Sequence, residues 1–368
     1  MEKLLVVSCV SDDVKAPISI YLLKNYLEDV VTGVEKYAAN IDARVMYLLP
    51  ENTDVEGLDG EVRYTGYVSP TLNNPYSVAQ VLSGNLPRPM IQDDFVAEYE
   101  NQEVFVITPE TAYGIAKGTD EKFVVINNGD KTDVKKVNVG TKISEVISLD
   151  GVKALLLGGL KGEFVLPSNA ADYSIEAAEK YSSITVYTNE DCIVESCVKL
   201  MNQAKDASCG KCVLCREGTS QFNQIVEEMT TGKAKMTDVD LIKEVSELIS
   251  IGAYCPFGQN MTKPLVSALE LFAEEFEEHI KRKVCKCGKC YKAAELYYID
   301  PDECQGCGDC IDACPEDAIE GKDGFIHVID QDLCEQCGKC VAACDEGCIK
   351  TAAKLPKLPK KRTKVGKF

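Results

Sequence analysis

The sequence of 368 residues contains no tryptophan, only two histidines and no apolar stretch of membrane-spanning length. A membrane-spanning helix needs about 20 mostly apolar residues, so a membrane channel is excluded. The first residues, MEKLLVVSCVSDDVK, form a short apolar run that Asp12 and Asp13 interrupt, with no small-residue cleavage site. This pattern favours a buried strand over a signal peptide, and we expect a cytoplasmic protein.

Positive charge is also scarce. The 59 Asp and Glu residues outnumber the 40 Lys and Arg residues, which gives a formal net charge of -19. A chain this acidic repels phosphate backbones, so we expect no nucleic-acid partner. The basic residues cluster mainly in residues 354–368, whose prolines prevent an amphipathic helix. We expect this basic tail to be solvated and disordered.

Cysteine, in contrast, is abundant, with 19 residues. Because the thiols of a cytosolic protein are kept reduced, this density favours metal binding over disulfides. Sixteen of the cysteines lie between Cys209 and Cys348. The other three, Cys9, Cys192 and Cys197, have no ligand spacing and are expected to be buried thiols.

Two cysteine runs near the C-terminus have the spacing of a two-cluster ferredoxin, in which the fourth cysteine of each run ligates the other cluster. Two zinc knuckles are the alternative, but they usually lack the third cysteine and the exchanged fourth. The predicted ligands of cluster one are Cys304, Cys307, Cys310 and Cys344, and those of cluster two are Cys334, Cys337, Cys340 and Cys314.

Two details of these runs depart from the ferredoxin pattern. Cys344 precedes Asp345 instead of a proline, but the proline is not a ligand, so the assignment stands. Cys348 is left over and is expected to be a buried thiol. We also expect His327 to be a structural side chain in a ferredoxin strand.

A third cluster is predicted at Ser208 to Thr219, which reads SCGKCVLCREGT. Three cysteines at this spacing that open a helix, together with one distant cysteine between helices, can bind a 4Fe-4S cluster. The helix N-terminus stabilises the negative charge of the cluster. The predicted ligands are Cys209, Cys212, Cys215 and Cys255.

A fourth set combines one imidazole with three thiols, namely His279, Cys285, Cys287 and Cys290. Such a set suits a closed, tetrahedral and therefore structural zinc site. A fourth iron-sulfur cluster is the rival interpretation. The imidazole favours zinc.

The motif SCGKCVLCREGT closely resembles the cluster motif of the NADH-oxidising flavoprotein subunit of respiratory complex I. It is equally similar to the beta subunits of soluble, electron-bifurcating hydrogenases and formate dehydrogenases. Residues 137–175 are similar to the ubiquitin-like (SLBB-type) ligand-binding module of this family, and LFAEEFEEHI resembles the end of its helical domain. The double ferredoxin extension and the His and Cys hinge are similar to those of the hydrogenase-type subunits, although Cys287 is extra.

The first 100 residues depart from this resemblance. Family members bind FMN and NADH through a Gly-rich GRGGAGFPTG-type loop and an acidic pair, and residues 1–100 contain neither. No phosphate-cradling glycine loop follows the first predicted strand, where Val10 leads directly into Ser11 and Asp12. Residues 21–50 and 70–79 resemble only remnants of that domain. We therefore predict that FMN and NAD are absent.

Hydrophobic patterning and the resemblance together predict a multi-domain α+β protein. We expect three helices between about Cys192 and Lys283. The predicted parts are a degenerate α/β flavoprotein-like domain (1–100), a β-grasp-like SLBB-type module (101–187), a helical 4Fe-4S domain (188–283), a zinc hinge (284–294), a two-cluster ferredoxin domain (295–353) and the basic tail (354–368).

Three clusters without a visible substrate pocket indicate an electron relay. The hypothesis is an electron-transfer subunit of an anaerobic, cytoplasmic hydrogenase or formate dehydrogenase type complex, without catalytic residues of its own. The resemblance implies three partners: the catalytic subunit, a flavin-containing paralogue and a thioredoxin-like 2Fe-2S subunit. The alternatives are a flavin-dependent NAD(P)H dehydrogenase subunit with a diverged FMN site, and a scaffold whose clusters only hold the fold.

Overall fold

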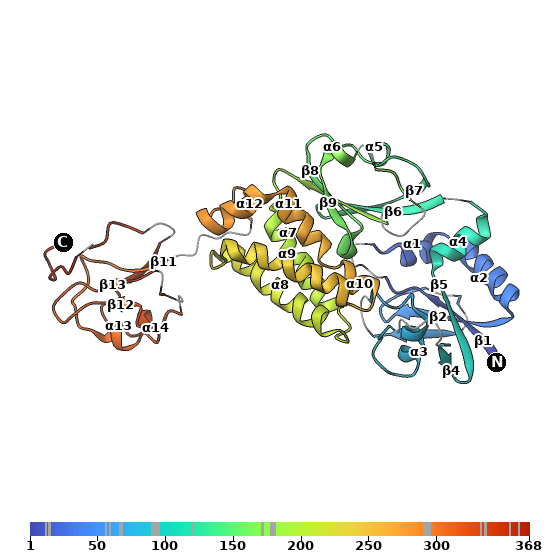
Figure 1. The fold of residues 1–368 in the computed structure, drawn as a ribbon, viewed down its shortest axis with the longest axis horizontal. Helices are drawn as coiled ribbons and strands as arrows, with labels where there is room; N and C mark the ends of the chain where they lie inside the picture. Colours follow the sequence, from blue (N-terminus) through green and yellow to red (C-terminus); the bar gives the residue numbers. More distant parts are fainter. Residues whose placement is uncertain are drawn as a thin grey trace. The chain divides into compact units, whose positions relative to one another are not determined.

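The structure is a computed structural model of the whole chain (Figure 1). It describes all residues except 12, 14–15, 56, 59, 66–68, 90–95, 120, 171–172, 177–181, 290–295, 332, 335–336, 353–354 and 360. The chain divides into two compact units, Met1–Cys290 and Tyr291–Phe368, and each is described by itself.

The first sheet of the larger unit has the strand order β3-β2-β1-β5-β4. Its strands are β1 (Glu2–Ser8), β2 (Ala43–Pro50), β3 (Glu61–Tyr64), β4 (Glu98–Tyr99) and β5 (Gln102–Ile107). All neighbours are parallel except β4 and β5. Alternate residues of β1 enter different cores, since Leu5 and Val7 belong to one cluster and Leu4 and Val6 to another. Both faces of the sheet are therefore covered, as is typical of parallel sheets.

The helices around this sheet are α1 (Ile18–Asn25), α2 (Leu27–Ile41), α3 (Pro75–Leu82) and α4 (Pro109–Lys117). Helices α2 and α4 are close neighbours, as Gly33 of α2 shows. A Cβ built on Gly33 would lie only 1.8 Å from the carbonyl oxygen of Ala112 in α4. Helices α1 and α2 are separate because Tyr26 between them leaves the helical conformation, with φ -139°.

A second sheet follows, with the mixed order β7-β6-β10-β8-β9. Its strands are β6 (Glu121–Asn128), β7 (Lys131–Asn138), β8 (Val152–Leu157), β9 (Glu163–Val165) and β10 (Ser183–Thr188), accompanied by α5 (Ile143–Val146), η1 (Gly159–Lys161) and α6 (Pro167–Ala170). Strand β10 pairs in parallel with β6 and antiparallel with β8. This arrangement places the last strand in the middle of the sheet.

A helical bundle completes the larger unit, and the prediction of three helices was wrong. The bundle contains α7 (Ile193–Ala207), α8 (Val213–Thr231), α9 (Met236–Gly252), α10 (Pro256–Asn260), α11 (Lys263–Leu271), α12 (Ala273–Glu277) and the π-helical turn η3 (Glu278–Arg282). The apolar stripe from Leu265 to Ile280 does not form one helix. Phe272 leaves the helical conformation between α11 and α12, with φ -121° and ψ 33°.

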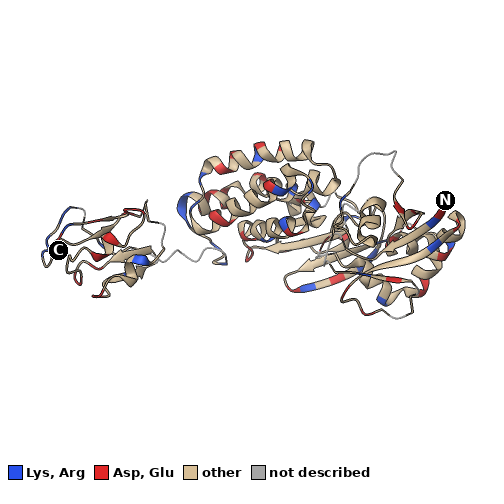
Figure 2. Cartoon of the chain, turned by 90° about the horizontal axis from the view of Figure 1, so that it is seen from below, with Lys and Arg blue, Asp and Glu red and all other residues tan. Residues whose placement is uncertain are grey.

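The smaller unit consists of two similar halves. Strand β11 (Leu296–Ile299) pairs with β14 (Ile349–Ala352), and β12 (Ile319–Glu320) pairs with β13 (Val328–Ile329), both antiparallel. One short helix lies in each half, α13 (Asp309–Asp312) and α14 (Lys339–Ala342). The core of this unit consists largely of isoleucines and cysteines. Acidic residues are distributed over its ribbon in Figure 2.

The end of the basic tail is ordered, contrary to the prediction. Residue Lys364 pairs with Phe325 in an antiparallel bridge. The Ile326 N–H donates to the Thr363 carbonyl (2.9 Å), and the Val365 N–H donates to the Gly324 carbonyl (3.2 Å). The tail therefore adds a short extended segment to the smaller unit, which is called the ferredoxin unit below because it contains the two ferredoxin-type cysteine runs. Across the described part of the chain, no helix combines the length and apolar character that a membrane crossing requires.

Candidate metal centres

The predicted ligands of the helical cluster come together at the ends of two helices. Cys212 precedes the first residue of α8, Cys215 lies in its first turn, and Cys255 precedes α10. Cys215 and Cys255 are buried in the bundle core, whereas Cys209 and Cys212 are partly exposed. Two polar contacts to sulfur accompany them. The Tyr254 N–H donates to the Cys212 sulfur (3.4 Å), and the Ser208 hydroxyl lies 3.6 Å from the Cys215 sulfur.

The electrostatics of this group indicate thiols that need a cation to ionise. Burial is the main reason that the pKa of Cys215 is raised to about 11; the Ser208 hydroxyl opposes this shift, and the nearby Cys255, Cys212 and Cys209 add to it. The pKa of Cys255 is raised too, again mainly by burial. Four sulfurs that disfavour each other's charge form a suitable donor set for iron, which replaces their protons.

In the smaller unit, the cysteines group as the exchanged ferredoxin pattern requires. Burial, together with the nearby sulfurs of Cys304, Cys307 and Cys344, raises the pKa of Cys310 to about 12. The pKa of Cys340 is raised by burial and by nearby Cys334 and Cys314. A small cavity is lined by all four predicted ligands of cluster two, together with Tyr297. Each group therefore offers the all-thiolate donor set of a 4Fe-4S cluster.

His327 and Cys348 lie beside the first of these groups. His327 precedes β13 and is not part of a strand, which corrects the prediction. Its Nδ1 lies 3.2 Å from the Cys310 sulfur, and its ring is 1% exposed. Burial lowers the pKa of His327, and the Lys322 carbonyl opposes part of this shift. Cys348 is buried as predicted, with its sulfur 3.4 Å from that of Cys344.

His279 lies in a separate group that the sequence prediction defined only in part. The ligand atoms of Cys192, His279 and Cys285 lie within 4.8 Å of one another. The Cys192 sulfur is 3.3 Å from Nε2 of His279, and Nδ1 of the same ring lies 2.7 Å from the Glu275 carbonyl. A Nδ1–H that donates to this carbonyl leaves the Nε2 lone pair facing the two sulfurs, as in zinc sites with an orienting second contact.

Cys192 is the residue that the sequence prediction missed. It is 87 residues from His279 in the chain, and such a distance carries no local spacing signal. Its buried position was predicted correctly. The available signal was its place before a helix, since Cys192 is the N-cap of α7. The bundle brings it to His279 because α7 packs against α11 and α12.

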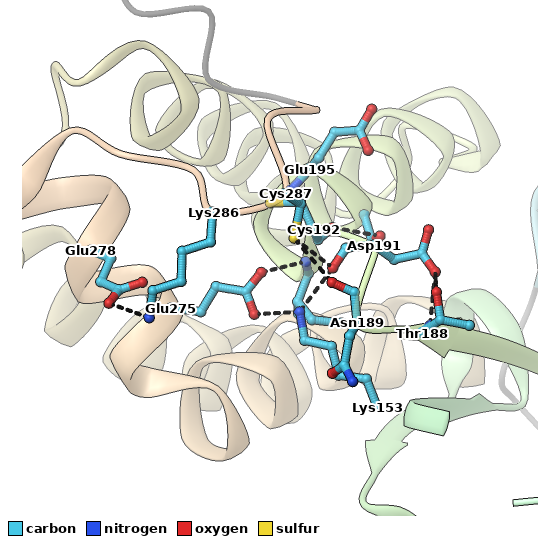
Figure 3. Close-up of polar contacts among 12 residues, drawn as sticks. Lys153, Thr188, Asn189, Asp191, Cys192, Glu195, Glu275, Glu278, Lys286 and Cys287 are labelled. Atoms are coloured by element: carbon cyan, nitrogen blue, oxygen red, sulfur yellow. Dashed lines mark hydrogen bonds and ion pairs between the residues drawn. The ribbon is translucent and has the colours of Figure 1, made fainter. Parts of the chain in front are cut away.

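A network of ion pairs supports the loop that presents Cys192 (Figure 3). The Glu275 carboxylate accepts hydrogen bonds from the Ile193 N–H (2.9 Å) and from Lys153 (2.8 Å). Lys153 also donates to the Asp191 carbonyl (2.8 Å). The Asp191 carboxylate accepts from the Thr188 N–H and hydroxyl, which together with Lys289 lower its pKa against the opposing effect of burial. The position of Cys192 is therefore fixed by several elements.

The other two predicted ligands of this site differ in their placement. The Cys287 sulfur lies 3.3 Å from the Asp191 carbonyl oxygen and 3.7 Å from that of Asn189, so its thiol donates to the backbone (Figure 3). It is not among the three residues whose ligand atoms converge. Cys290 lies outside the described residues.

A crevice lies at the carboxyl ends of β1 and β5 in the amino-terminal sheet. Ligands of open parallel sheets commonly bind at such a position, where the strand order reverses. The crevice is lined by Ser8, Ser11, Asn73 and Thr108 among others, and its volume is about 60 Å³. The buried Ser8 hydroxyl has no hydrogen-bond partner among the described residues. Typical ligand pockets measure about 300–1,000 Å³, so the described crevice is small for a flavin.

Comparison with protein families gives two matches. The "NADH-ubiquinone oxidoreductase-F iron-sulfur binding region" matches residues 195–279, and the "4Fe-4S dicluster domain" matches residues 296–345. These regions contain the helical cysteine set and the two ferredoxin runs. The chain therefore contains iron-sulfur binding regions of both kinds, one in the helical bundle and one in the smaller unit.

Comparison with individual proteins gives the relationship. The HndC subunit of the NADP-reducing hydrogenase of Solidesulfovibrio fructosivorans is 30% identical over 316 residues, which cover 76% of this chain and 64% of HndC. The F subunit of the NADH-quinone oxidoreductase of Streptomyces coelicolor is 31% identical over 103 residues, or 28% of this chain and 23% of that relative. The chain is homologous to both, and it spans less than two thirds of their length.

A solved structure shows the same fold. It is a crystal structure of NAD+-reducing [NiFe]-hydrogenase in the H2-reduced state, with a TM-score of 0.66 and 16% identity. The match covers 76% of this chain and 56% of the chain in that crystal structure.

Proposed function

We propose that this chain relays electrons through three 4Fe-4S clusters within a cytoplasmic hydrogenase or formate dehydrogenase type complex. The observation that carries the proposal is the presence of three separate groups of four thiols. The proposed ligands are Cys209, Cys212, Cys215 and Cys255 in the helical domain, Cys304, Cys307, Cys310 and Cys344 for cluster one, and Cys334, Cys337, Cys340 and Cys314 for cluster two.

The relay proposal includes the loss of flavin and nucleotide binding. Its support is the lack of a glycine-rich phosphate loop in residues 1–100 and the small described crevice at the end of β1. The proposed partners are the catalytic subunit, a flavin-containing paralogue and a thioredoxin-like 2Fe-2S subunit. The order of the second sheet, in which the last strand is central, supports a β-grasp-like SLBB-type module.

One observation favours the alternative, a flavin-dependent NAD(P)H dehydrogenase subunit. The crevice lies where nucleotide ligands bind in parallel α/β sheets, and the Ser8 hydroxyl that lines it has no hydrogen-bond partner in the described part of the chain. A flavin bound there would make this chain the site of hydride chemistry.

We also propose a structural zinc ion held by Cys192, His279 and Cys285, with Cys290 as the fourth ligand. The 3.3 Å separation of the Cys192 sulfur and the His279 Nε2 supports a single ion over a cubane cluster. Zinc–ligand bonds of about 2.0–2.3 Å in a tetrahedron place neighbouring ligand atoms ~3.5 Å apart. Cys287 then orients the loop that carries Asp191.

The deciding experiment is the iron, zinc and flavin content of the anaerobically purified chain. The relay proposal expects about twelve irons, one zinc and no flavin per chain. Stoichiometric FMN would overturn the relay proposal in favour of the dehydrogenase alternative. About sixteen irons without zinc would instead identify the His279 group as a fourth cluster.

A further inference from the structure

The two halves of the ferredoxin unit carry different rings at one corresponding position. Tyr297-Tyr298-Ile299-Asp300 precedes Cys304 as His327-Val328-Ile329-Asp330 precedes Cys334. Each half therefore has a ring seven residues before its first cysteine. His327 contacts Cys310 of cluster one, and Tyr297 lines the cavity formed by the ligands of cluster two. The same place in the repeat is thus an imidazole at one cluster and a phenol at the other.

The imidazole of His327 is held firmly in its position. The ring is 1% exposed, and Gly321 lies directly against it. A Cβ built on Gly321 would lie 1.9 Å from the ring carbon Cδ2, so any larger residue there would displace the ring. The preceding residue is fixed by the hydrogen bond from the Ile326 N–H to the Thr363 carbonyl. The contact between Nδ1 and the Cys310 sulfur is therefore a defined feature of the fold.

The direction of this hydrogen bond follows from the chemistry of the sulfur. An iron-bound thiolate has no proton and only accepts hydrogen bonds. The Nε2 of His327 is buried and makes no hydrogen bond of standard geometry among the described residues, although the Lys322 carbonyl lies near the ring. A tautomer protonated only at Nε2 would point the Nδ1 lone pair at the sulfur lone pairs. The Nδ1–H form removes this repulsion and supplies a donor.

We propose that His327 sets the reduction potential of cluster one. Its contact with Cys310 gives cluster one the higher potential of the two clusters in the ferredoxin unit, so that an electron in this unit resides mainly on cluster one. The proposal rests on the function proposed above, in which Cys310 ligates cluster one. Reduction adds one electron to the cluster and increases the negative charge on its sulfurs, and no bond forms or breaks. An N–H donor stabilises the reduced form more than the oxidised form and so raises the reduction potential.

A second donor acts on the same ligand set. The Cys348 sulfur lies 3.4 Å from that of Cys344. When Cys344 is bound to iron, the remaining proton belongs to Cys348, which donates an S–H hydrogen bond, although a weak one. Its effect on cluster one has the same sign as that of His327.

The test is a potentiometric titration of the full chain, with the reduced clusters followed by electron paramagnetic resonance. His327→Phe keeps a ring against Gly321 and removes the donor. We expect it to lower the higher of the two ferredoxin midpoint potentials by ~59 mV. For a one-electron couple, this shift changes the ratio of reduced to oxidised cluster about tenfold. His327→Asn, which retains an amide N–H near Nδ1, should keep most of the parental midpoint. Tyr297→Phe is the matched control in the other half and should leave cluster one unchanged.

The possible results separate the two proposals. A parent chain with fewer than about twelve irons contradicts the relay, whereas full iron content and midpoints unmoved by His327→Phe contradict only the role of His327. If His327→Phe shifts the lower midpoint potential instead, cluster one is not the cluster of higher potential, and the proposal is overturned. Equal shifts in His327→Phe and His327→Asn assign the effect to packing and overturn the hydrogen bond.

A further variant keeps the test decisive if His327→Phe loses iron. Gly321→Ala retains the imidazole but displaces it from Cys310, so it should lower the same midpoint while His327→Asn does not. A lowered midpoint in His327→Asn together with an unchanged midpoint in Gly321→Ala would overturn the proposal.

Discussion

Cys192 is well placed to act as a metal ligand because it caps the N-terminus of α7. Its sulfur accepts a hydrogen bond from the Glu195 N–H (3.5 Å), and the helix dipole favours a thiolate at this position. The neighbouring Cys197 lies one turn further along α7 and is equally buried. The two thiols share a helix and a core but differ in their contact with His279.

We therefore predict that Cys192→Ala abolishes zinc binding and that Cys197→Ala retains it. Both changes remove one buried sulfur, so a general loss of packing would affect them alike. The measurement is zinc content by elemental analysis of the purified variants. Retention of one zinc in Cys192→Ala would remove Cys192 from the proposed ligand set.

The extended segment Thr363–Val365 is the element that the sequence prediction treated as disordered. The basic tail that contains this segment, residues 354–368, has a high density of Lys and two prolines, which is typical of a solvated tail, and these features dominated the prediction. The hydrogen bonds that order it connect residues about forty positions apart, and no local pattern reports them. The apolar side chain of Val365 packs on the core of the ferredoxin unit.

We predict that Val365→Pro lowers the free energy of unfolding of the ferredoxin unit by about 1 kcal/mol, because it removes the N–H that donates to Gly324. Thr363→Pro is the matched control, since only the carbonyl of Thr363 takes part in the bridge. The readout is denaturant-induced bleaching of cluster absorbance. Equal destabilisation by both prolines would contradict a specific role of the Val365 hydrogen bond.

Helices and strands were predicted well where a short stretch of sequence carries the whole signal. The apolar run at the start of the chain forms β1, and the three closely spaced cysteines of SCGKCVLCREGT open α8. The break at Phe272 was not predicted, because the apolar periodicity of residues 265–280 continues through it. The site of His279 was only half predicted for a related reason, since a metal ligand on a distant helix leaves no spacing signal.

At the scale of the whole molecule, the buried thiols couple metal loading to folding. In the iron-free chain, the pKa of Cys215 is raised to about 11 and that of Cys310 to about 12, mainly by burial, from ordinary values near 9. At pH values between the ordinary thiol pKa near 9 and these raised pKa values, the folded iron-free chain binds more protons than the unfolded chain. Its stability is therefore fully present below about pH 9 and is lost as the pH rises towards 11 and above.

We predict opposite pH trends for the two forms of the protein. The iron-free chain loses stability above about pH 9, because its buried thiols ionise less readily than those of the unfolded chain. In the loaded protein the same sulfurs are bound as thiolates, so stability rises with pH up to about 9 as the unfolded thiols stop competing for protons. Denaturant titrations of both forms across this range are the measurement. Parallel trends would show that these thiols do not control the stability.

Both histidines of the chain are buried, and each lies beside a cysteine of a different proposed metal centre. Isotopic labelling of histidine alone would therefore introduce nuclear spins at two places only, one next to the zinc ligands and one next to a cluster sulfur. A magnetic resonance spectrum of such a sample has no background from surface imidazoles. The protein thus provides an internal pair of reporters, one diamagnetic and one sensitive to each electron that reaches cluster one.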